Sequence, residues 1–252
     1  MKTAVITGAS SGIGEATARR LARDGWQLLL VARREERLAS LCSELGGGCI
    51  YEAADLTGAA APERIAARVE SELGRLDLLV NNAGGNRKRG AFADADYGYD
   101  YIHEVMEQNF DSAVRVTEAL LPILRRSVPS AIVNVSSIAG RIARPGTSAY
   151  SAAKFAHAGW TESLYHEERA HGVHVGLVTP GFIVTEGFPQ EQLTRKPWTR
   201  WMVGTPEQAA DAILAAANGK AELSVPRWYG ALPRLRYGTP RLVRFAMSGR
   251  KR

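Results

Sequence analysis

The chain has only two cysteines in 252 residues, Cys42 and Cys49. Two thiols cannot build a framework of several disulfides, and no further ligands stand with them at the spacing of a zinc site. We therefore expect reduced thiols, buried or half-buried, in a cytoplasmic protein without a metal site. A run of about 18 apolar residues is also lacking, which argues against a transmembrane helix. A strand-like segment follows Met1 almost at once and leaves no room for a signal peptide.

The segment from Arg227 to Arg252 lacks acidic residues and carries eight basic ones. The net charge of +6 comes from this tail, because the rest of the chain has 24 basic and 26 acidic residues. The body shows no basic face interleaved with aromatic side chains, so we do not expect nucleic acid as a partner. We divide the chain into a domain over residues 1–226 and a basic tail over 227–252 that is not an independent domain.

Within the tail, Thr239 can cap, Pro240 can begin and Gly249 can end a short helix. Its apolar stripe is flanked by Arg241 and Arg244 and consists of Leu242, Val243, Ala246 and Met247. Two interpretations stay open. The favoured one is a strap that packs on a neighbouring subunit. The other is a peripheral membrane contact, since basic residues near anionic lipid contribute about 1 kcal/mol each.

Short apolar segments alternate with helical patterns along the body. The apolar segments, interpreted as strands, cover Thr3–Thr7, Leu28–Val31, Cys49–Ala53, Leu76–Val80, Ala131–Val135, Val173–Val178 and Ala221–Val225. The helical patterns lie near Ile13–Asp24, Glu35–Leu45, Pro62–Gly74, Ile102–Arg126, Ser148–His171 and, after Thr205 as N-cap, Pro206–Asn218. This alternation indicates a parallel sheet covered on both faces. We predict an α/β fold, a single doubly wound Rossmann-type domain with about seven parallel strands and helices on both faces.

Gly8, Gly12 and Gly14 lie between the first strand and the first helix in VITGASSGIGEATA. In a dinucleotide-binding loop, such glycines serve a tight turn, a close backbone approach to a pyrophosphate, and close packing of the helix on the strand. The helix N-terminus then offers unpaired N–H groups and the positive end of its dipole to the phosphates. Glycines often mark plain turns, but the position between a strand and a helix favours the dinucleotide-binding loop.

Four further motifs follow that loop. They are NNAG at Asn81–Gly84, NVSS at Asn134–Ser137, YSAAK at Tyr150–Lys154 and PGFIVT at Pro180–Thr185. Together with the G-x-x-x-G-x-G spacing of the loop, their order and spacing resemble the short-chain dehydrogenase/reductase family over roughly residues 3 to 185. The resemblance implies hydride transfer between a nicotinamide coenzyme and a small-molecule carbonyl or alcohol. It also implies a homodimer or homotetramer.

Tyr150 and Lys154 are four residues apart and share one face of a predicted helix. A nearby ammonium lowers the pKa of a phenol from its free value near ~10, which suits a general acid/base. The resemblance makes Tyr150 that acid/base and makes Ser137, thirteen residues earlier, the group that polarises the substrate oxygen. Ser136 is the rival candidate. The resemblance also assigns Asn109 to a water-mediated proton relay with Lys154, although a mid-helix asparagine usually faces solvent.

The resemblance further implies a coenzyme-binding surface. Lys154 would also bind the nicotinamide ribose, Thr185 would contact the carboxamide or phosphate side, and Asp55 and Leu56 would meet the adenine. The whole predicted set is Gly8, Ser10, Ser11, Gly12, Ile13, Gly14, Arg33, Arg34, Asp55, Leu56, Asn82, Ala83, Gly84, Tyr150, Lys154, Pro180, Gly181, Ile183 and Thr185.

The end of the second strand bears on the choice of coenzyme. An NAD site usually presents an acid about 20 residues beyond the glycine loop, and the resemblance places that acid where Ala32 stands here. Ala32 removes a carboxylate that would repel a 2′-phosphate, and Arg33 supplies a permanently charged partner for it. Arg34 either assists or faces solvent. We predict NADP(H) in preference to NAD(H).

Large apolar side chains follow the PG dipeptide, in a segment over about 182–203 where the resemblance implies a mobile substrate lid. They favour a bulky or apolar substrate, although core packing explains about half of them equally well. The predicted function is an NADP(H)-dependent carbonyl reductase or alcohol dehydrogenase. The alternative is an NADP(H)-binding sensor of the same fold with little turnover. The large side chains are Phe182, Phe188, Trp198, Trp201 and Met202.

Overall fold

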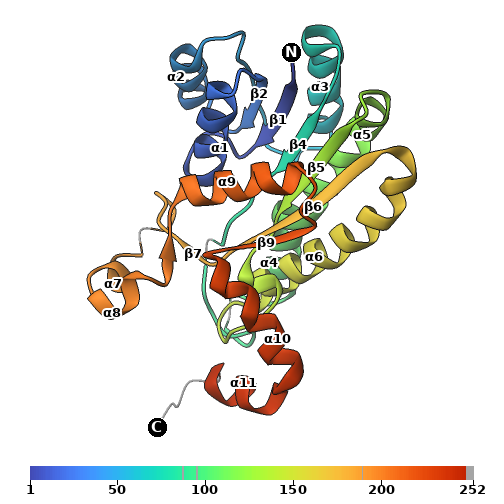
Figure 1. The fold of residues 1–252 in the computed structure, drawn as a ribbon. Helices are drawn as coiled ribbons and strands as arrows, with labels where there is room; N and C mark the ends of the chain where they lie inside the picture. The colour runs from blue at the N-terminus through green and yellow to red at the C-terminus, as the bar shows by residue number, and fades with distance from the viewer. Residues whose placement is uncertain (87, 95, 189, 248–252) are drawn as a thin grey trace.

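A computed structural model describes residues 1–86, 88–94, 96–188 and 190–247. Seven strands form one parallel sheet in the order β3-β2-β1-β4-β5-β6-β9 (Figure 1). The strands are β1 (Thr3–Thr7), β2 (Gln27–Ala32), β3 (Ile50–Ala53), β4 (Leu78–Asn81), β5 (Ser130–Val135), β6 (Val173–Pro180) and β9 (Glu222–Val225). The predicted parallel sheet of about seven strands is confirmed.

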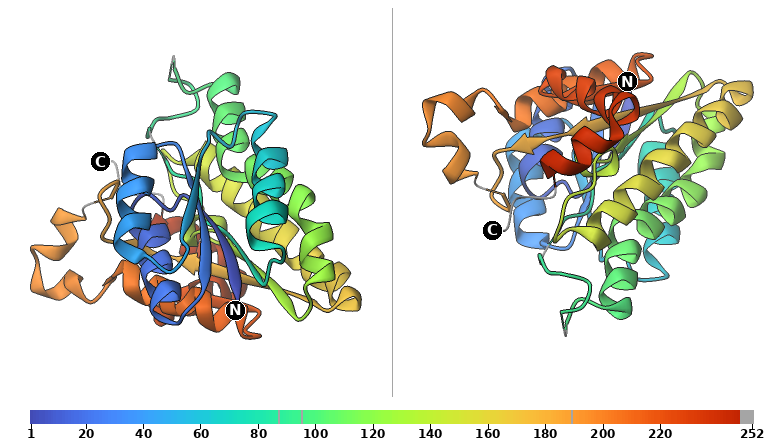
Figure 2. Two further views of the ribbon diagram at one scale, coloured as in Figure 1. Left: turned by 90° about the horizontal axis from the view of Figure 1, so that it is seen from above. Right: turned by 90° about the horizontal axis from the view of Figure 1, so that it is seen from below.

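Helices cover both faces of this sheet, as Figure 2 shows in its left view. One face carries α1 (Gly12–Arg23), α2 (Glu35–Leu45) and α9 (Pro206–Ala217). The other carries α3 (Ala61–Arg68), which continues as the π-helical η1 (Val69–Leu73), α5 (Ser112–Arg126) and α6 (Ser148–Glu168), which ends in η4 (Arg169–His171). α4 (Tyr99–Met106) packs on α6 and joins α5 through the π-helical η2 (Glu107–Asp111). The doubly wound arrangement is therefore confirmed.

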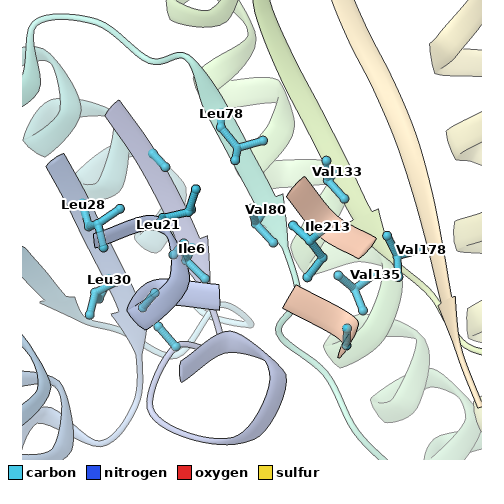
Figure 3. Packing of buried hydrophobic residues seen from close by; sticks show 14 of the residues in the cluster. Ile6, Leu21, Leu28, Leu30, Leu78, Val80, Val133, Val135, Val178 and Ile213 are labelled. Atoms are coloured by element: carbon cyan, nitrogen blue, oxygen red, sulfur yellow. The ribbon is translucent and has the colours of Figure 1, made fainter. Parts of the chain in front are cut away.

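Alternation along the strands divides the core into two layers. Ile6 points to the layer of α1, α2 and α9, while its neighbour Val5 points to the layer of α3, α5 and α6. Leu28 and Leu30 pair with the first layer in the same way, and Leu29 lies in the second. Figure 3 shows the first layer, in which side chains of the strands meet those of α1 and α9. Because both faces are covered, the middle residues of strands such as β1 and β2 are apolar on both sides of the sheet.

The first core layer supplies a stability prediction. Ile6 is fully buried, so Ile6→Ala removes its contacts with both strands and helices and leaves a cavity. We expect the free energy of unfolding to fall by about 2–5 kcal/mol, measured by urea denaturation. The exposed residue Glu118 on α5 provides the control, and Glu118→Ala should change the same quantity by no more than about 0.5 kcal/mol. Equal losses in the two variants would contradict this description of the core.

The strand order reverses next to β1, and this reversal positions the functional site. From β1 the chain winds outward through β2 to β3 and then crosses back to place β4 on the other side of β1. The connections that follow β1 and β4 leave the sheet in opposite directions, which opens a crevice at the carboxyl ends of these two strands. Ligands of open α/β sheets bind in such a crevice.

Two segments add structure that the sequence pattern did not indicate. A short parallel pair, β7 (Phe182–Ile183) with β8 (Val203–Gly204), encloses α7 (Glu191–Thr194) and α8 (Pro197–Arg200). This segment lies to the side of the main sheet in Figure 1. A short helix, η3 (Ile138–Gly140), follows β5.

The tail forms η5 (Arg227–Gly230), α10 (Ala231–Gly238) and α11 (Pro240–Met247). The helix expected from Pro240 is present, but its expected end at Gly249 and the side chains of Ala246 and Met247 lie outside the described residues. Leu242 is exposed and Val243 is half-buried. α10, which was not predicted, contacts the body because Arg236 donates a hydrogen bond of 2.6 Å from Nη1 to the Arg141 carbonyl.

The cysteines correct an expectation. Cys42 at the end of α2 and Cys49 before β3 form a disulfide, with their Cα atoms 5.1 Å apart, instead of two reduced thiols. The glycine turn over 46–48 reverses the chain between them, as the hydrogen bond of 2.9 Å from Cys49 N to Gly46 O shows. Among the described residues, none of the helices has the length and apolar character needed to cross a bilayer.

Candidate active site

The glycine loop brings α1 unusually close to the chain that precedes it. A Cβ on Gly14 would lie 2.3 Å from the Gly8 carbonyl oxygen, so only glycine fits there. Gly8 itself has φ +67°, a conformation that favours glycine. Ser11 precedes α1 with extended backbone, and its side chain makes no capping hydrogen bond. The first N–H groups of α1 therefore face the crevice without a side-chain partner, as an anion site requires.

Thr7 joins the glycine loop to the NNAG motif. Its Oγ1 accepts hydrogen bonds of 3.0 Å from both Asn82 N and Ala83 N and donates one of 3.2 Å to Val80 O. Asn82 Nδ2 in turn donates to the Thr7 carbonyl at 2.9 Å. These bonds fix the chain after β4 against the end of β1, directly beside the predicted phosphate site. Sequence reasoning missed Thr7, because the sequence identifies it only as a β-branched residue of a strand.

Ser137 and Tyr150 lie together at the opposite end of the crevice. Ser137 follows β5 and accepts a hydrogen bond of 3.1 Å at Oγ from Ala139 N. Its Oγ also donates to the Pro180 carbonyl at 3.4 Å, and its side chain lies close enough to Tyr150 to oppose the rise in the pKa of the phenol. The rival candidate Ser136 is buried and donates to the Lys154 carbonyl at 2.9 Å, which ties it to the backbone of α6. Of the two serines, Ser137 is therefore the one paired with the tyrosine.

The phenol of Tyr150 differs from the sequence-based expectation. Burial raises its pKa above the usual value, and the Ser137 side chain and the positive charge of Arg144 oppose that rise only in part. Lys154 lies one turn further along α6, with its Nζ 5.9 Å from the centre of the Tyr150 ring. The expected decrease in the pKa of Tyr150 is wrong, because burial outweighs the groups that lower it.

Lys154 is itself buried, at 3% exposure, and donates a hydrogen bond of 3.1 Å from Nζ to the Val135 carbonyl. Burial lowers its pKa from 10.5 to about 8, because the charged ammonium loses its hydration. The site thus contains a phenol whose acidity is weakened and an amine that titrates near neutral pH.

The depressed pKa of Lys154 makes folding stability depend on pH. Between pH 8 and pH 10.5, Lys154 binds more protons in the unfolded chain than in the native state. The stability that the neutral amine gives the native state is therefore fully present above pH 10.5, and it is lost as the pH falls to the folded pKa of about 8. Relative to Lys154→Met, the native protein should gain about 1 kcal/mol per pH unit as the pH rises through this window. Urea denaturation at several pH values measures the difference, and parallel curves for the two proteins would contradict it.

Asn109 lies behind the catalytic end of the crevice in the π-helical η2, and it is fully buried instead of solvent-facing. Its Oδ1 accepts a hydrogen bond of 2.9 Å from Gly85 N, and its Nδ2 donates to Gly85 O and Val105 O at 3.0 Å each. A Cβ on Gly84 would lie 2.6 Å from Asn109 Oδ1 and 3.4 Å from Lys154 Nζ. Asn109 therefore holds the loop after β4 beside the lysine. π-Helical turns of this kind often occur at functional sites.

The two arginines after β2 are unequal. Arg34 donates to Ser10 Oγ at 3.1 and 3.2 Å and to Ser10 O at 3.2 Å, and it lies 3.5 Å from Glu186. Arg33 is exposed, lines the crevice, and has no hydrogen bond or ion pair with any described residue. Ala32, the last residue of β2, directly precedes the two arginines and is buried. Asp55 and Leu56 line the same end of the crevice.

The segment after β6 forms the remaining wall. Phe182 and Phe188 line the crevice, as part of the lid expectation requires. Trp198 and Trp201 do not, since they are 71% and 61% exposed and Trp201 contacts Trp228 with ring centres 4.8 Å apart. Met202 accepts a hydrogen bond of 3.1 Å at its carbonyl from the Tyr229 hydroxyl.

The crevice gathers nearly the whole predicted site. Its catalytic part has a volume of about 570 Å³, and a second part of about 550 Å³ continues toward Arg33 and Asp55. Every predicted site residue lines one part or the other except Gly14 and Asn109, which lie behind the wall. The lining side chains that sequence reasoning missed include Arg89, Gln108 and Arg144. The available signal for Arg144 was a basic residue in the short loop between Ser137 and Tyr150.

Comparison with known proteins gives the same class. The family model described as short chain dehydrogenase matches residues 2–196. A short chain dehydrogenase from Pseudocercospora fijiensis is 36% identical over 196 residues, covering 76% of this chain and 63% of its own length. A 3-oxoacyl-[acyl-carrier-protein] reductase from Vibrio cholerae is 32% identical and covers 87% of this chain and 91% of its own. The crystal structure of a short-chain dehydrogenase from Streptomyces avermitilis aligns with TM-score 0.79 and 30% identity, covering 97% of both chains.

The chain therefore belongs to the short-chain dehydrogenase/reductase family. This is a family of oxidoreductases whose members bind a nicotinamide coenzyme and small-molecule substrates and typically form oligomers. The chain spans less than two thirds of the Pseudocercospora relative's length.

Proposed function

We propose that this protein is an NADP(H)-dependent oxidoreductase that interconverts a carbonyl and an alcohol by hydride transfer. The observation that carries the proposal is that Ser137 and Tyr150 lie together, with Lys154 one helical turn away, at the end of a crevice that begins at a glycine loop. Asn109 completes the proposed catalytic set by way of the loop that it holds beside Lys154.

The residues present fit a dinucleotide coenzyme. The absence of side chains at Gly8 and Gly14 lets a pyrophosphate approach the N-terminus of α1. Ser10, Ser11, Gly12 and Ile13 would complete that phosphate site. Asp55 and Leu56 would meet the adenine, and Asn82, Ala83, Gly84, Pro180, Gly181, Ile183 and Thr185 would hold the nicotinamide half.

We assign the coenzyme preference to NADP(H) because the two arginines after β2 differ in their partners. The guanidinium of Arg33 lacks a counter-ion among the described residues and borders the adenine end, while Arg34 is committed to Ser10. A 2′-phosphate would supply the missing negative charge, and a planar guanidinium binds phosphate well.

The bound coenzyme would supply or accept the hydride. Ser137 would donate a hydrogen bond to the substrate oxygen, and Tyr150 would give its phenolic proton to that oxygen or take it back. The raised pKa of Tyr150 keeps the phenol protonated at neutral pH, which suits the reductive direction. Lys154, buried beside the ring, would bind the ribose and receive protons from solvent through the segment that Asn109 holds.

We assign coenzyme binding and catalysis to residues 1–226, with about 182–203 as a substrate lid, and propose a cytoplasmic homodimer or homotetramer. Phe182 and Phe188 at the crevice favour a substrate with a bulky or apolar part. Residues 227–252 would form a strap on a neighbouring subunit, because Leu235, Leu242 and Phe245 are more than half exposed in the single chain. A membrane contact is the alternative, and co-sedimentation with anionic liposomes at low salt would support it over the strap.

The direct test is a screen for NADPH oxidation with ketones, aldehydes, quinones and steroids. We expect turnover with at least one class and slower turnover when NADH replaces NADPH. Tight NADPH binding without turnover on any class would overturn the enzymatic proposal and favour the sensor of the same fold.

A further inference from the structure

The catalytic part of the crevice is lined by cations without acids. Besides Arg33 and Lys154, its wall includes Arg89, from the loop after β4, and Arg144, from the loop before α6. Among the described residues, no aspartate or glutamate lines this part of the crevice. A crevice lined by charge of one sign favours ligands of the opposite sign.

Arg144 is half-buried and lacks an acidic partner among the described residues. Its guanidinium carbon lies 5.3 Å from the centre of the Phe182 ring, so an aromatic face covers one side of the cation. Burial and the positive charge of Arg89 both lower the pKa of this group. A partly desolvated cation beside another cation costs stability unless an anion joins it. Such an arrangement in a crevice is typical of a binding site.

Arg89 and Arg144 lie apart from the adenine end of the crevice. The part of the crevice that continues toward the adenine end is lined by Ser10, Arg33, Arg34 and Asp55, and neither Arg89 nor Arg144 belongs to it. Arg144 instead lies close enough to Tyr150 for its charge to act on the phenol. Arg144 is therefore on the side of the reacting oxygen.

We propose that Arg144, assisted by Arg89, binds an anionic group of the substrate, so that the enzyme acts on carbonyl or hydroxy compounds carrying a carboxylate next to an apolar portion. This rests on the proposed oxidoreductase function. Arginine binds a carboxylate through two parallel hydrogen bonds, which fixes the orientation as well as the charge of the ligand. Phe182, which packs on the same guanidinium, and Phe188 would contact the apolar portion.

Matched keto acids and their methyl esters test the proposal. Benzoylformate, 3-benzoylpropionate and 4-benzoylbutyrate vary the distance between the carbonyl and the charge, and each ester removes only the charge. For at least one acid, we expect Arg144→Met to lower kcat/KM by about ten- to a hundredfold. The same variant should affect the corresponding ester much less, because there it acts only through the pKa of Tyr150.

Three further variants sharpen the comparison. Arg89→Met should give a smaller loss confined to the acids, and Arg144→Lys should recover part of the activity on them. Arg126→Met is the matched control, because Arg126 is an exposed arginine of α5 that does not line the crevice. It should leave the ratio of acid to ester unchanged. Equal effects of Arg144→Met on acids and esters would overturn the proposal while leaving the oxidoreductase function intact.

A measurement independent of turnover separates the two proposals. The fluorescence of bound NADPH is followed while the complex is titrated with 3-phenylpropionate, which has no reducible carbonyl. We expect saturable binding that Arg144→Met weakens about tenfold or more and that Arg126→Met leaves unchanged. Binding with this pattern but no turnover would support the anion site and reject the oxidoreductase function. Absence of binding by the native complex would overturn the anion site.

Discussion

Tyr150→Phe is expected to lower kcat for carbonyl reduction by about 10²–10⁴-fold, because it removes the phenolic proton beside Ser137 while it keeps the ring. The coenzyme should still bind, since the glycine loop and the adenine end are unchanged and only one hydroxyl of the coenzyme-binding set is lost. Single-turnover measurement of NADPH oxidation, combined with titration of NADPH fluorescence, separates the chemical step from binding.

The matched control is Tyr237→Phe, which removes a hydroxyl from a tyrosine of α10 that is 73% exposed. This variant should retain native kcat and Kd. If Tyr150→Phe reduces the substrate as fast as the native enzyme, another group supplies the proton and the assignment of Tyr150 is wrong.

Arg33→Ala is expected to weaken NADPH binding by about ten- to a hundredfold and to change NADH binding by no more than about twofold. The reason is that a charge-assisted hydrogen bond contributes about 1.5–3 kcal/mol, and only NADPH carries the 2′-phosphate that would form one. Equilibrium titration of both coenzymes measures the two Kd values at one salt concentration.

Arg34→Ala is the informative companion. Arg34 donates hydrogen bonds to Ser10 within the phosphate loop, so its loss should weaken both coenzymes to a similar extent. If Arg33→Ala instead weakens NADPH and NADH equally, Arg33 has a structural role and does not select the coenzyme.

The seven-stranded sheet and its covering helices were predictable because their segments have strong local patterns in the sequence. The boundaries of the strands were less predictable, because tertiary contacts decide where a strand begins. Leu76 is apolar and buried, but its N–H donates to Ser127 Oγ at 3.0 Å, and β4 begins only at Leu78. Cys49 was assigned to a strand, whereas its N–H closes the turn onto Gly46 and β3 begins at Ile50. In both cases the apolar side chain points inward, while the backbone N–H forms a hydrogen bond outside the sheet.

The catalytic residues were predictable from motifs, and their electrostatics were not. The spacing of Tyr150 and Lys154 places them on one helical face, but the burial of the phenol depends on tertiary packing that the spacing does not encode. That burial raises the pKa where the spacing alone suggested a decrease. Arg89 and Arg144 lie in loops without periodicity, so no pattern placed them at the crevice.

Transfer of deuterium from NADPH labelled at C4 tests the central claim most directly. After turnover with a ketone from the screen, the alcohol is analysed by mass spectrometry. NADPH labelled on the face of the ring that meets the substrate should give one deuterium at the carbinol carbon. NADPH labelled on the other face should give none. The same experiment with Tyr150→Phe should show the same position of the label at a rate lowered about 10²–10⁴-fold. An alcohol without deuterium from either labelled coenzyme would contradict hydride transfer in this site.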